Sequence, residues 1–404
     1  MQDVEAAEMI RVPYGQTVHG EEEINAVIEV LRTSTQMGKH VREMQDNVAA
    51  LFAKKYGVMV NSGSSANYLA VEILDLPPLS EVITPIVTFA TTVAPLVKNN
   101  LIPTFVDVAK GTYNIDVTKI EEMITPNTRA MIIPNLLGNL PDWDVIAEIA
   151  KQHNLFIIED SCDTLGATLR ETSTGTRAHI STTSFYGNHV INCAGNGGML
   201  CMNEDLLAEK ALLLRSWGRS SSLFVESEKI ENRFDIELDG MRYDRKFIFS
   251  DIGYNLEPSE MGAAFGLVQL KKLPYFIALR NKFFRSHLEF FKQYEEWFIL
   301  PEQLAEAKTG WMNFPLTVLD SAPFSRTELQ IFFERNNIQT RPVFTGNVLR
   351  QPAFRNIKRN EAKNGYAEAD KVMRGGILIG CHHGLNETKI NHIYSTFKKF
   401  VASL

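Results

Sequence analysis

The sequence predicts an α/β protein of two domains, a large one built on a mostly parallel sheet covered by helices and a smaller α+β one after it. Short runs of Val, Ile and Leu alternate with helical segments, and these runs lack the polar alternation of a sheet with one wet face. After Pro301 the order of strands and helices changes. A chain of 404 residues suits two domains, which we place at 1–270 and 271–404.

The first elements follow from the spacing of apolar side chains. From residue 21 to 56 these recur at helical spacing, which predicts two helices joined by a loop at 33–38. Residues 58–61 form a short buried strand that leads into a small-residue turn at 62–67 and a further helix. The next expected elements are strand 81–85, helix 91–98, strand 104–107, helix 117–124, strand 130–134, helix 143–153 and strand 155–158.

The second half of the chain is predicted in the same way. A strand at 181–185 precedes a glycine-rich turn at 195–198 that lets the chain double back. The polar, weakly patterned segment 219–247 is expected to form an excursion over the site or to be disordered. The remaining elements are helix 204–217, a helix ending at 270, a long helix at 275–298, strands 311–318, 339–343 and 377–379, and helices 326–336 and 387–400.

Composition limits the possible partners. Hydrophobic residues make up 45% and charged residues 22% of the chain, which is ordinary for a globular protein with a sizeable core. The net charge is -7 and Lys and Arg form no basic face, so we expect no nucleic acid and no membrane as a partner. The acidic start, Met1 to Glu8, has no apolar region of the signal-peptide kind, and a cytoplasmic protein is expected. The 4 cysteines are scattered without a C-x-x-C pair, so no metal site is predicted.

Three motifs follow predicted strands, where ligands collect in parallel sheets. The turn at Ser62, Gly63 and Ser64 places N–H groups and hydroxyls at a helix N-terminus, where a phosphate is favoured by about 1 kcal/mol. An ordinary serine cap explains the same residues. Phe89 could stack on a flat ligand or pack in the core. Consecutive acids at 159–160 suit a ligand-facing carboxylate, with a solvated turn as the alternative.

The segment 184–198 carries the most specific signal. It reads Ser-Phe-Tyr-Gly-Asn-His followed by a glycine-rich turn ending in Gly197-Gly198. It resembles the cofactor loop of the DegT-type sugar aminotransferases, in which a lysine binds pyridoxal phosphate covalently. Here His189 stands in the lysine position, and no lysine occurs between Lys151 and Lys210. The chain therefore resembles the 3-dehydratase branch of that family, which acts on nucleotide-linked 4-keto-6-deoxyhexoses.

Further segments match this branch in the expected order, so the resemblance extends from about Tyr14 to the end of the chain. It implies the aspartate-aminotransferase-like fold (fold type I), a homodimer with shared sites, and pyridoxal or pyridoxamine phosphate held without a covalent bond. The matching segments are 61–67, 137–139, 158–166, 253–255, 340–342 and 346–347.

The resemblance also assigns roles to individual residues. His189 is the catalytic residue. Arg341 and Asn347 are candidates for sugar or nucleotide contacts, with a structural role nearly as well supported. The cofactor-binding residues are Gly63, Ser64 and Ser184 at the phosphate, Phe89 on the ring, Asp160 at the ring nitrogen, Asp163 near the ring hydroxyl, and Asn255 at the phosphate of the neighbouring subunit.

The implied reaction removes the C3 hydroxyl of the sugar, with glutamate restoring the amine form of the cofactor. A histidine suits this work because its ordinary pKa of about 6.5 lets it take and return protons near neutrality. Some members of the branch hold an iron-sulfur cluster on cysteines after a Trp-Gly-Arg motif. Here Trp217-Gly218-Arg219 is followed by no cysteine before Cys381, so the chain resembles the cluster-free members.

Two other functions stay open at this point. The protein could be a related dehydratase that depends on a separate reductase, or a non-catalytic binding protein that lost the lysine, with His189 in a purely structural role. The sequence does not identify the nucleotide among GDP, CDP and dTDP. The cluster-free members act on the GDP-mannose series, which favours GDP.

Overall fold

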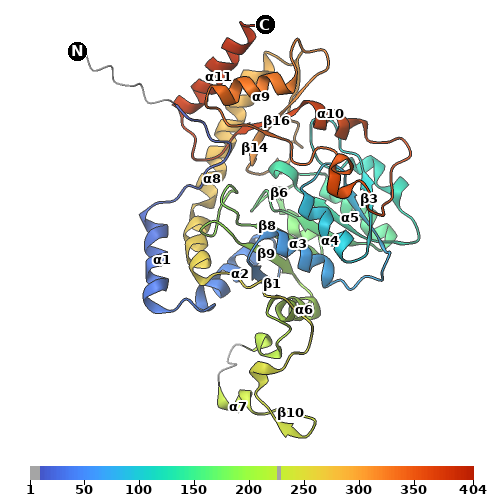
Figure 1. Ribbon diagram of the computed structural model, residues 1–404, viewed down its shortest axis with the longest axis vertical. Coiled ribbons are helices and arrows are strands. Elements are labelled where there is room, and N and C mark those ends of the chain that lie inside the picture. Colours follow the sequence, from blue (N-terminus) through green and yellow to red (C-terminus); the bar gives the residue numbers. More distant parts are fainter. Residues whose placement is uncertain (1–9, 225–228) are drawn as a thin grey trace, which may run out of the picture.

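The computed structural model describes residues 10–224 and 229–404 (Figure 1). The acidic segment at the start of the chain, on which the signal-peptide expectation rested, lies outside the described residues. Within those two stretches, no helix has the length and apolar character that crossing a membrane requires.

The large sheet has seven strands and is mostly parallel, as predicted. The strands β8, β5, β4, β2 and β3 pair in parallel, whereas β9 is antiparallel to both of its neighbours. In spatial order the sheet comprises β1 (Tyr56–Val60), β9 (Gly198–Met202), β8 (Ile180–Ser184), β5 (Phe156–Asp160), β4 (Thr128–Pro134), β2 (Glu81–Pro85) and β3 (Ile102–Val106).

Helices cover both faces of this sheet, which explains why its strands are apolar without alternation. Val58 packs on one face with Leu69 of a helix, while its neighbour Met59 packs on the other face with Met44. The first face is covered by α3 (Gly63–Glu72), α4 (Ala90–Lys98) and α6 (Asp205–Arg215). The second face is covered by α2 (Lys39–Leu51), α5 (Trp143–His153) and α8 (Glu260–Lys292), and α1 (Glu21–Thr33) packs on α8.

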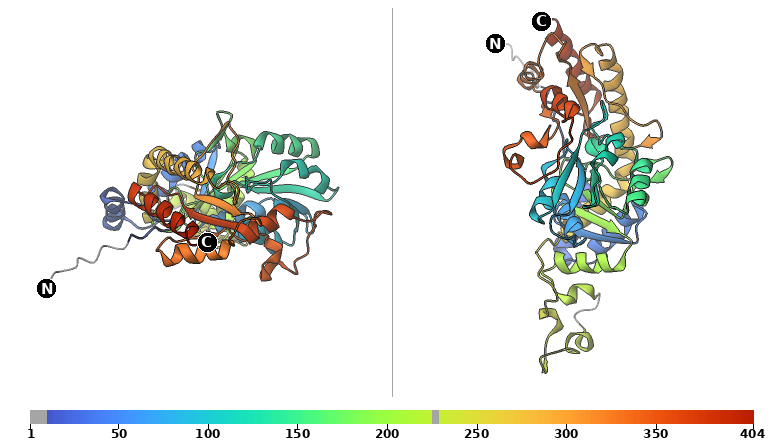
Figure 2. Two further views of the ribbon diagram at one scale, coloured as in Figure 1. Left: turned by 90° about the horizontal axis from the view of Figure 1, so that it is seen from above. Right: turned by 90° about the vertical axis from the view of Figure 1, so that its right-hand side faces the viewer.

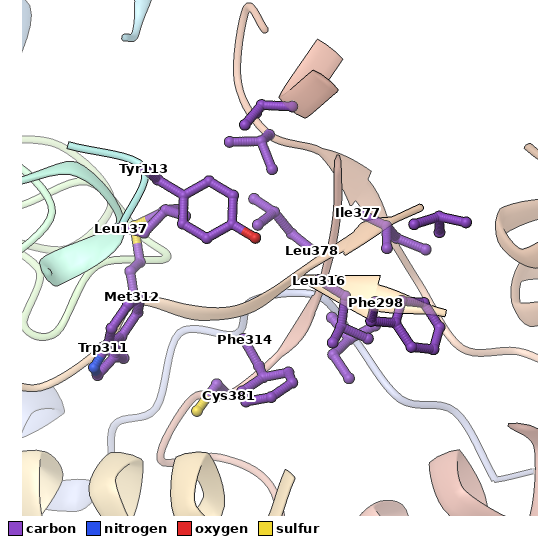
Figure 3. Packing of buried hydrophobic residues seen from close by; sticks show 14 of the residues in the cluster. Tyr113, Leu137, Phe298, Trp311, Met312, Phe314, Leu316, Ile377, Leu378 and Cys381 are labelled. Carbon is purple, nitrogen blue, oxygen red and sulfur yellow. The ribbon is translucent and has the colours of Figure 1, made fainter. Parts of the chain in front are cut away.

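A second, antiparallel sheet forms the centre of the C-terminal part. Its strands are β12 (Phe298–Ile299), β14 (Asn313–Val318), β16 (Gly376–Gly380) and β15 (Arg341–Pro342), and its helices are α9 (Arg326–Arg335), α10 (Ala367–Gly375) and α11 (Glu387–Val401). Tyr113 and Leu137, which come from the part of the chain that builds the large sheet, pack beside Met312, which directly precedes β14, and its neighbours (Figure 3). One apolar cluster therefore joins the two parts of the molecule.

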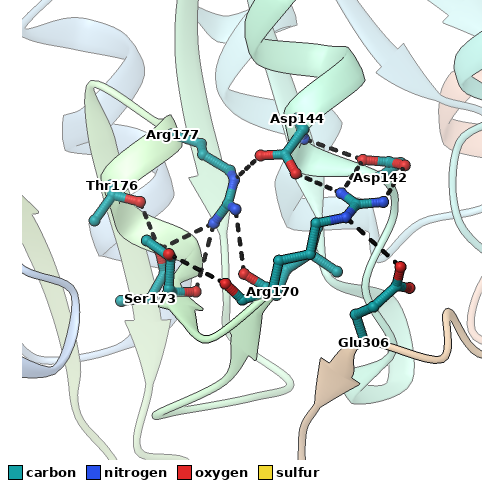
Figure 4. Close-up of polar contacts among 9 residues, drawn as sticks. Asp142, Asp144, Arg170, Ser173, Thr176, Arg177 and Glu306 are labelled. Carbon is teal, nitrogen blue, oxygen red and sulfur yellow. Dashed lines mark hydrogen bonds and ion pairs between the residues drawn. The ribbon is translucent and has the colours of Figure 1, made fainter.

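A three-stranded sheet also ties the two parts together. In it β13 (Ala307–Lys308) pairs with β6 (Thr168–Leu169), which pairs with β7 (Thr172–Ser173). Beside it both terminal nitrogens of Arg170 lie 3.0 Å from Asp142 at the start of α5, and Arg170 Nε lies 3.8 Å from Glu306 (Figure 4). Arg170 and Arg177 both bind Asp144 in the same network. These contacts bind the segment before β14 to the part of the chain that carries α5, one of the helices covering the large sheet.

The structure corrects two predicted helices. Residues 117–124 form two 3₁₀ turns, Val117–Lys119 and Glu121–Met123, because β-branched residues and a chain that turns extended at Ile124 do not sustain an α-helix. The two helices predicted to meet near residue 270 are one 33-residue helix, α8, with Pro274 inside it. Leu273 and Phe276 on either side of the proline are buried, and this packing sustains the helix through the lost hydrogen bond. The division into domains at 270/271 falls within this helix and stays a prediction.

The segment 219–247 also differs from its prediction. Rather than lying over the strands' carboxyl ends, it projects from the α6 end of the molecule as a separate arm (Figures 1 and 2). Its described part folds on itself, because Arg233 Nε donates to both oxygens of Asp244 at 3.1 and 3.0 Å. The arm contains α7 (Ile230–Arg233), the hairpin β10 (Glu237–Leu238) and β11 (Met241–Arg242), and 3₁₀ turns at Ser220–Leu223 and Arg245–Phe247.

Candidate active site

A cavity of about 520 Å³ opens where the carboxyl ends of β5 and β8 meet the N-terminus of α3 and the start of β14. Of the ten residues predicted from the sequence, eight line this cavity. Asn255 and Asn347 do not, and neither does any described residue of the 219–247 arm. The eight are Gly63, Ser64, Phe89, Asp160, Asp163, Ser184, His189 and Arg341.

The N-terminus of α3 forms one wall. Ser62 caps this helix by accepting a hydrogen bond from Ser65 N at 3.1 Å, while the N–H groups of Gly63 and Ser64 have no acceptor within the helix. A Cβ on Gly63 would lie 2.5 Å from Ser184 Cβ, so only glycine lets the two elements approach this closely. The glycine-rich turn also approaches the start of α3 closely, since a Cβ on Gly198 would lie 2.2 Å from the Ser62 carbonyl oxygen. The result is an anion cradle of N–H groups and hydroxyls.

Asp160 lies at the end of β5, buried below the cavity floor with 5% of its surface exposed. Its Oδ2 accepts hydrogen bonds from Asn67 Nδ2 at 2.7 Å and Thr92 Oγ1 at 2.8 Å. Thr182 donates to the oxygen of the Asn67 amide at 2.5 Å, which turns the NH₂ group of that amide toward Asp160. Asp160 Oδ1 has the Cys162 N–H at 3.2 Å as its donor and keeps room for a donor from a ligand.

Asp163 is the second carboxylate of the cavity. The pKa of Asp163 is raised to about 7, mainly by burial and also by the nearby Asp160, while a hydrogen bond from Leu137 N at 2.8 Å acts in the opposite direction. Leu137 makes that bond from a left-handed conformation with φ 60°, which a leucine adopts at a cost of about 1 kcal/mol. The strained turn and Asp163 therefore hold each other in place, and Asp163 is half protonated near neutrality.

His189 lies between these groups with its imidazole turned by the backbone. Its Nδ1 hydrogen-bonds the carbonyl oxygen of Cys162, and because a carbonyl only accepts, Nδ1 carries the proton. The other nitrogen, Nε2, is then unprotonated in the neutral ring. Burial lowers the pKa of His189 to about 4, the bond to Cys162 opposes this shift, and the cation of Arg280 adds to it. The ring is therefore a neutral base at pH 7.

Arg280 of α8 is fully buried and lies next to the 184–198 loop that carries His189. It donates to the carbonyl oxygens of His189 at 3.2 Å, Met312 at 2.9 Å and Trp311 at 3.1 Å, and its Nε faces His383 Nδ1 at 3.3 Å. No acidic side chain in the described part of the chain forms an ion pair with it. This buried cation had no signal in the sequence, since arginine on a long helix is ordinarily exposed.

Aromatic rings flank the cavity mouth. Phe89 is 51% exposed and meets Phe344 edge to face with ring centroids 5.8 Å apart. A half-exposed phenylalanine beside a cavity offers its face to a flat ligand. Among the other lining residues, the guanidinium of Arg341 lies 5.3 Å from the ring centroid of Tyr14. Arg341 is the one cation among the described cavity-lining residues.

The two predicted residues outside the cavity have different surroundings. Asn347 is buried, donates from Nδ2 to Asp370 at 2.8 Å and caps a 3₁₀ turn through Leu349 N, which is a structural arrangement. Asn255 is exposed on the surface after the arm, where its Oδ1 accepts from Glu257 N at 3.4 Å. Their predicted ligand contacts stay predictions.

Several lining residues were not predicted. Asn67 and Thr92 had a usable signal, because each is a polar residue on the buried side of a helix that starts at a strand end. Tyr14 and Asn313 had none, since they reach the cavity through contacts between distant segments. The lining residues beyond the ten named above are Ser62, which belongs to the predicted phosphate turn, and Tyr14, Gly15, Asn67, Thr91, Thr92, Cys162, Tyr186, Asn188, Asn196, Gly197, Met312, Asn313, Pro342 and Phe344.

The model of the DegT/DnrJ/EryC1/StrS aminotransferase family matches residues 17–398. The chain belongs to this family, and the predicted aminotransferase-like fold is confirmed. It is 35% identical over 401 residues to dTDP-4-dehydro-2,6-dideoxy-D-glucose 3-dehydratase of Saccharopolyspora spinosa, covering 96% of this chain and 86% of that one.

Two further relatives carry a related name. GDP-4-keto-6-deoxy-D-mannose 3-dehydratase of Yersinia pseudotuberculosis is 31% identical over 399 residues, which cover 97% of this chain and 99% of that one. A solved structure of GDP-4-keto-6-deoxymannose-3-dehydratase with a trapped PLP-glutamate geminal diamine superimposes with a TM-score of 0.86 at 28% identity, covering 95% of this chain and 99% of that one.

Proposed function

We propose that this protein is an enzyme that uses pyridoxal and pyridoxamine phosphate to remove the C3 hydroxyl of a nucleotide-linked 4-keto-6-deoxyhexose. The observation that carries the proposal is His189 in the cavity, with Nδ1 held by a carbonyl and Nε2 unprotonated. None of the described residues that line the cavity is a lysine, so the amine that sugar aminotransferases use is missing there. The dehydratase names of the similar proteins support the same activity.

The cavity residues fit pyridoxal phosphate. The unsatisfied N–H groups at Gly63 and Ser64 suit its phosphate, and the half-exposed face of Phe89 suits its ring. Asp160 Oδ1 has room to accept a hydrogen bond from a protonated ring nitrogen. Asp163, half protonated near neutrality, suits a place beside a ring hydroxyl.

In its amine form the cofactor supplies a nitrogen that joins C4 of the sugar and a ring that accepts negative charge. Asp160, whose Oδ2 is already occupied by two donors, would accept a hydrogen bond from the ring nitrogen through Oδ1 and keep that nitrogen protonated. With the cofactor bound, His189 Nε2 would hold the proton that the cofactor gives up and would return it to the C3 oxygen, which would leave as water. Because Nδ1 is held by Cys162, the same nitrogen faces the reacting atoms in both transfers.

The proposed chemistry requires two features of the substrates, a keto group at C4 of the sugar and an amino donor. A 4-keto group is needed for the cofactor nitrogen to attach, and an amino donor such as glutamate is needed to restore the amine. The solved relative with PLP and glutamate trapped together supports glutamate in that role. The nucleotide stays open, because the two dehydratases at 35% and 31% identity carry dTDP and GDP in their names. The preference for GDP stays a prediction.

We also propose a homodimer in which Asn255 reaches the cofactor phosphate of the partner subunit. The exposed position of Asn255, close in sequence to the exposed apolar side chains of Phe249 and Ile252 that follow the arm, supports this arrangement. Isolated chains would leave those apolar surfaces in water. The expected cytoplasmic location stays a prediction.

The test measures product mass after the protein, loaded with pyridoxamine phosphate, is mixed with a 4-keto-6-deoxy sugar nucleotide and excess glutamate. We expect loss of one oxygen without any added reductase. The variant His189→Asn should abolish this loss, whereas His19→Asn, which changes an exposed histidine outside the cavity, should not. An added amino group would show an aminotransferase, and a requirement for an electron donor would show the reductase-coupled relative. Cofactor binding with no turnover would show a binding protein.

A further inference from the structure

The N-terminal segment before α1 forms a wall of the cavity. Val12 N donates to the carbonyl oxygen of Asn337 at 2.9 Å, which anchors this segment beside α9. Three residues on, a Cβ at Gly15 would lie 2.9 Å from Asn188 Cγ, and Thr17 Oγ1 donates to the Gly187 carbonyl oxygen at 3.0 Å. The segment therefore lies directly against the loop that carries His189.

Tyr14 sits at the centre of this segment and is held from both sides. Its backbone N–H donates to Gln339 Oε1 at 3.0 Å, and its carbonyl oxygen accepts from Asn313 Nδ2 at 3.0 Å. Arg341 lies against its ring. Tyr14 is a lining residue of the cavity, and its hydroxyl makes no hydrogen bond to any group in residues 10–224 and 229–404.

Burial keeps the proton on this phenol. Burial raises the pKa of Tyr14 well above its ordinary value, and the Asp163 carboxylate raises it further, while the cations Arg341 and Arg280 act in the opposite direction. The hydroxyl is thus a donor across the working pH range. Two other polar side chains of the cavity, Asn67 and Thr92, instead direct their donors to Asp160.

We propose that Tyr14 is a catalytic residue whose hydroxyl donates a hydrogen bond to the C3 oxygen of the sugar as that oxygen departs. This rests on the proposed function. The C3–O bond breaks with its electron pair on oxygen, and the oxygen takes the proton carried by His189 and leaves as water. Tyr14 keeps its own proton and stabilises the negative charge during the break. A preorganised donor of this kind strengthens as charge develops, so it acts on the rate more than on binding.

The test separates the two halves of the catalytic cycle in Tyr14→Phe. With pyridoxamine phosphate bound, the single-turnover rate of water loss from the sugar nucleotide should fall about 100-fold. With pyridoxal phosphate bound, the absorbance change on adding glutamate should be unaffected, because no C3 oxygen takes part. Calorimetric affinity of the cofactor-free protein for the sugar nucleotide should change far less than the rate. Tyr394→Phe, which removes a buried hydroxyl without a partner in the second domain, should alter neither half.

The possible outcomes distinguish a failure of the role of Tyr14 from a failure of the proposed function. If Tyr14→Phe loses water as fast as the wild type, the role of Tyr14 is refuted and the proposed function stands. Equal slowing of both half-reactions, or a loss of affinity as large as the loss of rate, would refute the role as well, because it would indicate a structural or ground-state contact. If the wild-type protein itself removes no water, the proposed function fails first, and the role of Tyr14 fails with it.

Discussion

Arg280 offers the sharpest test of how this site is built, because it is a buried cation whose partners are carbonyl oxygens and a histidine. The informative change is Arg280→Met, which keeps much of the side-chain volume and removes both the charge and the donors. Arg280→Lys keeps the charge but not the planar set of donors. Arg285→Met, at an exposed position of the same helix, is the matched control.

Two opposing effects determine the stability change. Burial lowers the pKa of Arg280 from 12.5 to about 10, so the site disfavours the charged form by about 3 kcal/mol, and the methionine recovers that energy. The change also leaves the carbonyl oxygens of His189, Trp311 and Met312 without this donor, at about 1–2 kcal/mol each. The net destabilisation should therefore be about 2 kcal/mol, below the roughly 3–5 kcal/mol for breaking a buried ion pair.

Catalysis should suffer in a different way. Without the cation, the pKa of His189 rises from about 4 toward 6.5, although burial, its larger cause, remains. A base must be unprotonated to act, so the acidic limb of kcat/KM for water loss should move to higher pH in Arg280→Met and stay in place in Arg280→Lys. Urea unfolding and the pH profile measure the two effects separately. An acidic limb that does not move in Arg280→Met would contradict the electrostatic role, and a destabilisation above about 5 kcal/mol would contradict the energy balance.

Two further predictions follow from the same geometry. Gly63→Ala should lower pyridoxal phosphate affinity in a fluorescence titration, because the new Cβ, 2.5 Å from Ser184 Cβ, forces α3 away from the cradle, whereas Gly20→Ala, with nothing within 4 Å, should not. Stability against urea should fall as pH drops below 6.5, by about 1.4 kcal/mol per pH unit for each histidine that burial holds neutral, because the unfolded chain then takes up more protons. Asp163, with its pKa raised to about 7, opposes this trend, but it is one group against four histidines. A urea midpoint that does not change between pH 7 and pH 5 would contradict the predicted loss of stability. The histidines are His189 and His287 with pKa about 4, His382 with about 3 and His383 with about 2.

The sequence was most informative where a signal was local. The bounds of β2 and α5 agree with the predicted 81–85 and 143–153, because each is a strongly patterned apolar run with clear ends. The strand β9 was missed, since its Met and Cys residues have no marked strand preference and it follows the glycine turn directly. Two helices, one ending at 270 and one beginning at 275, were predicted where a single helix continues through Pro274. Tertiary contacts outweighed local preference in both cases.

The same distinction holds in the site. Gly63, Asp160 and His189 could be named because each belongs to a short motif at a strand end, and all three line the cavity. Arg280 and Tyr14 could not, because one reaches the site from the middle of a long helix and the other from a segment more than 300 residues away from its partner Gln339 in sequence. Contacts of that range leave no pattern in a single chain.

His189 shows why identity alone does not define a catalytic residue. Its ordinary pKa of about 6.5 predicts a group that is partly protonated at neutral pH. In the folded protein burial and Arg280 lower that pKa to about 4, so the ring is a neutral base at pH 7 and binds an accepted proton only weakly. A weakly held proton is readily passed on to a departing oxygen, and the carbonyl of Cys162 ensures that the same nitrogen performs both transfers. A lysine at this position would carry a charge at the end of a flexible chain. A hydrogen bond to a backbone carbonyl would then occupy its one amine, whereas in His189 it leaves the second nitrogen free to react.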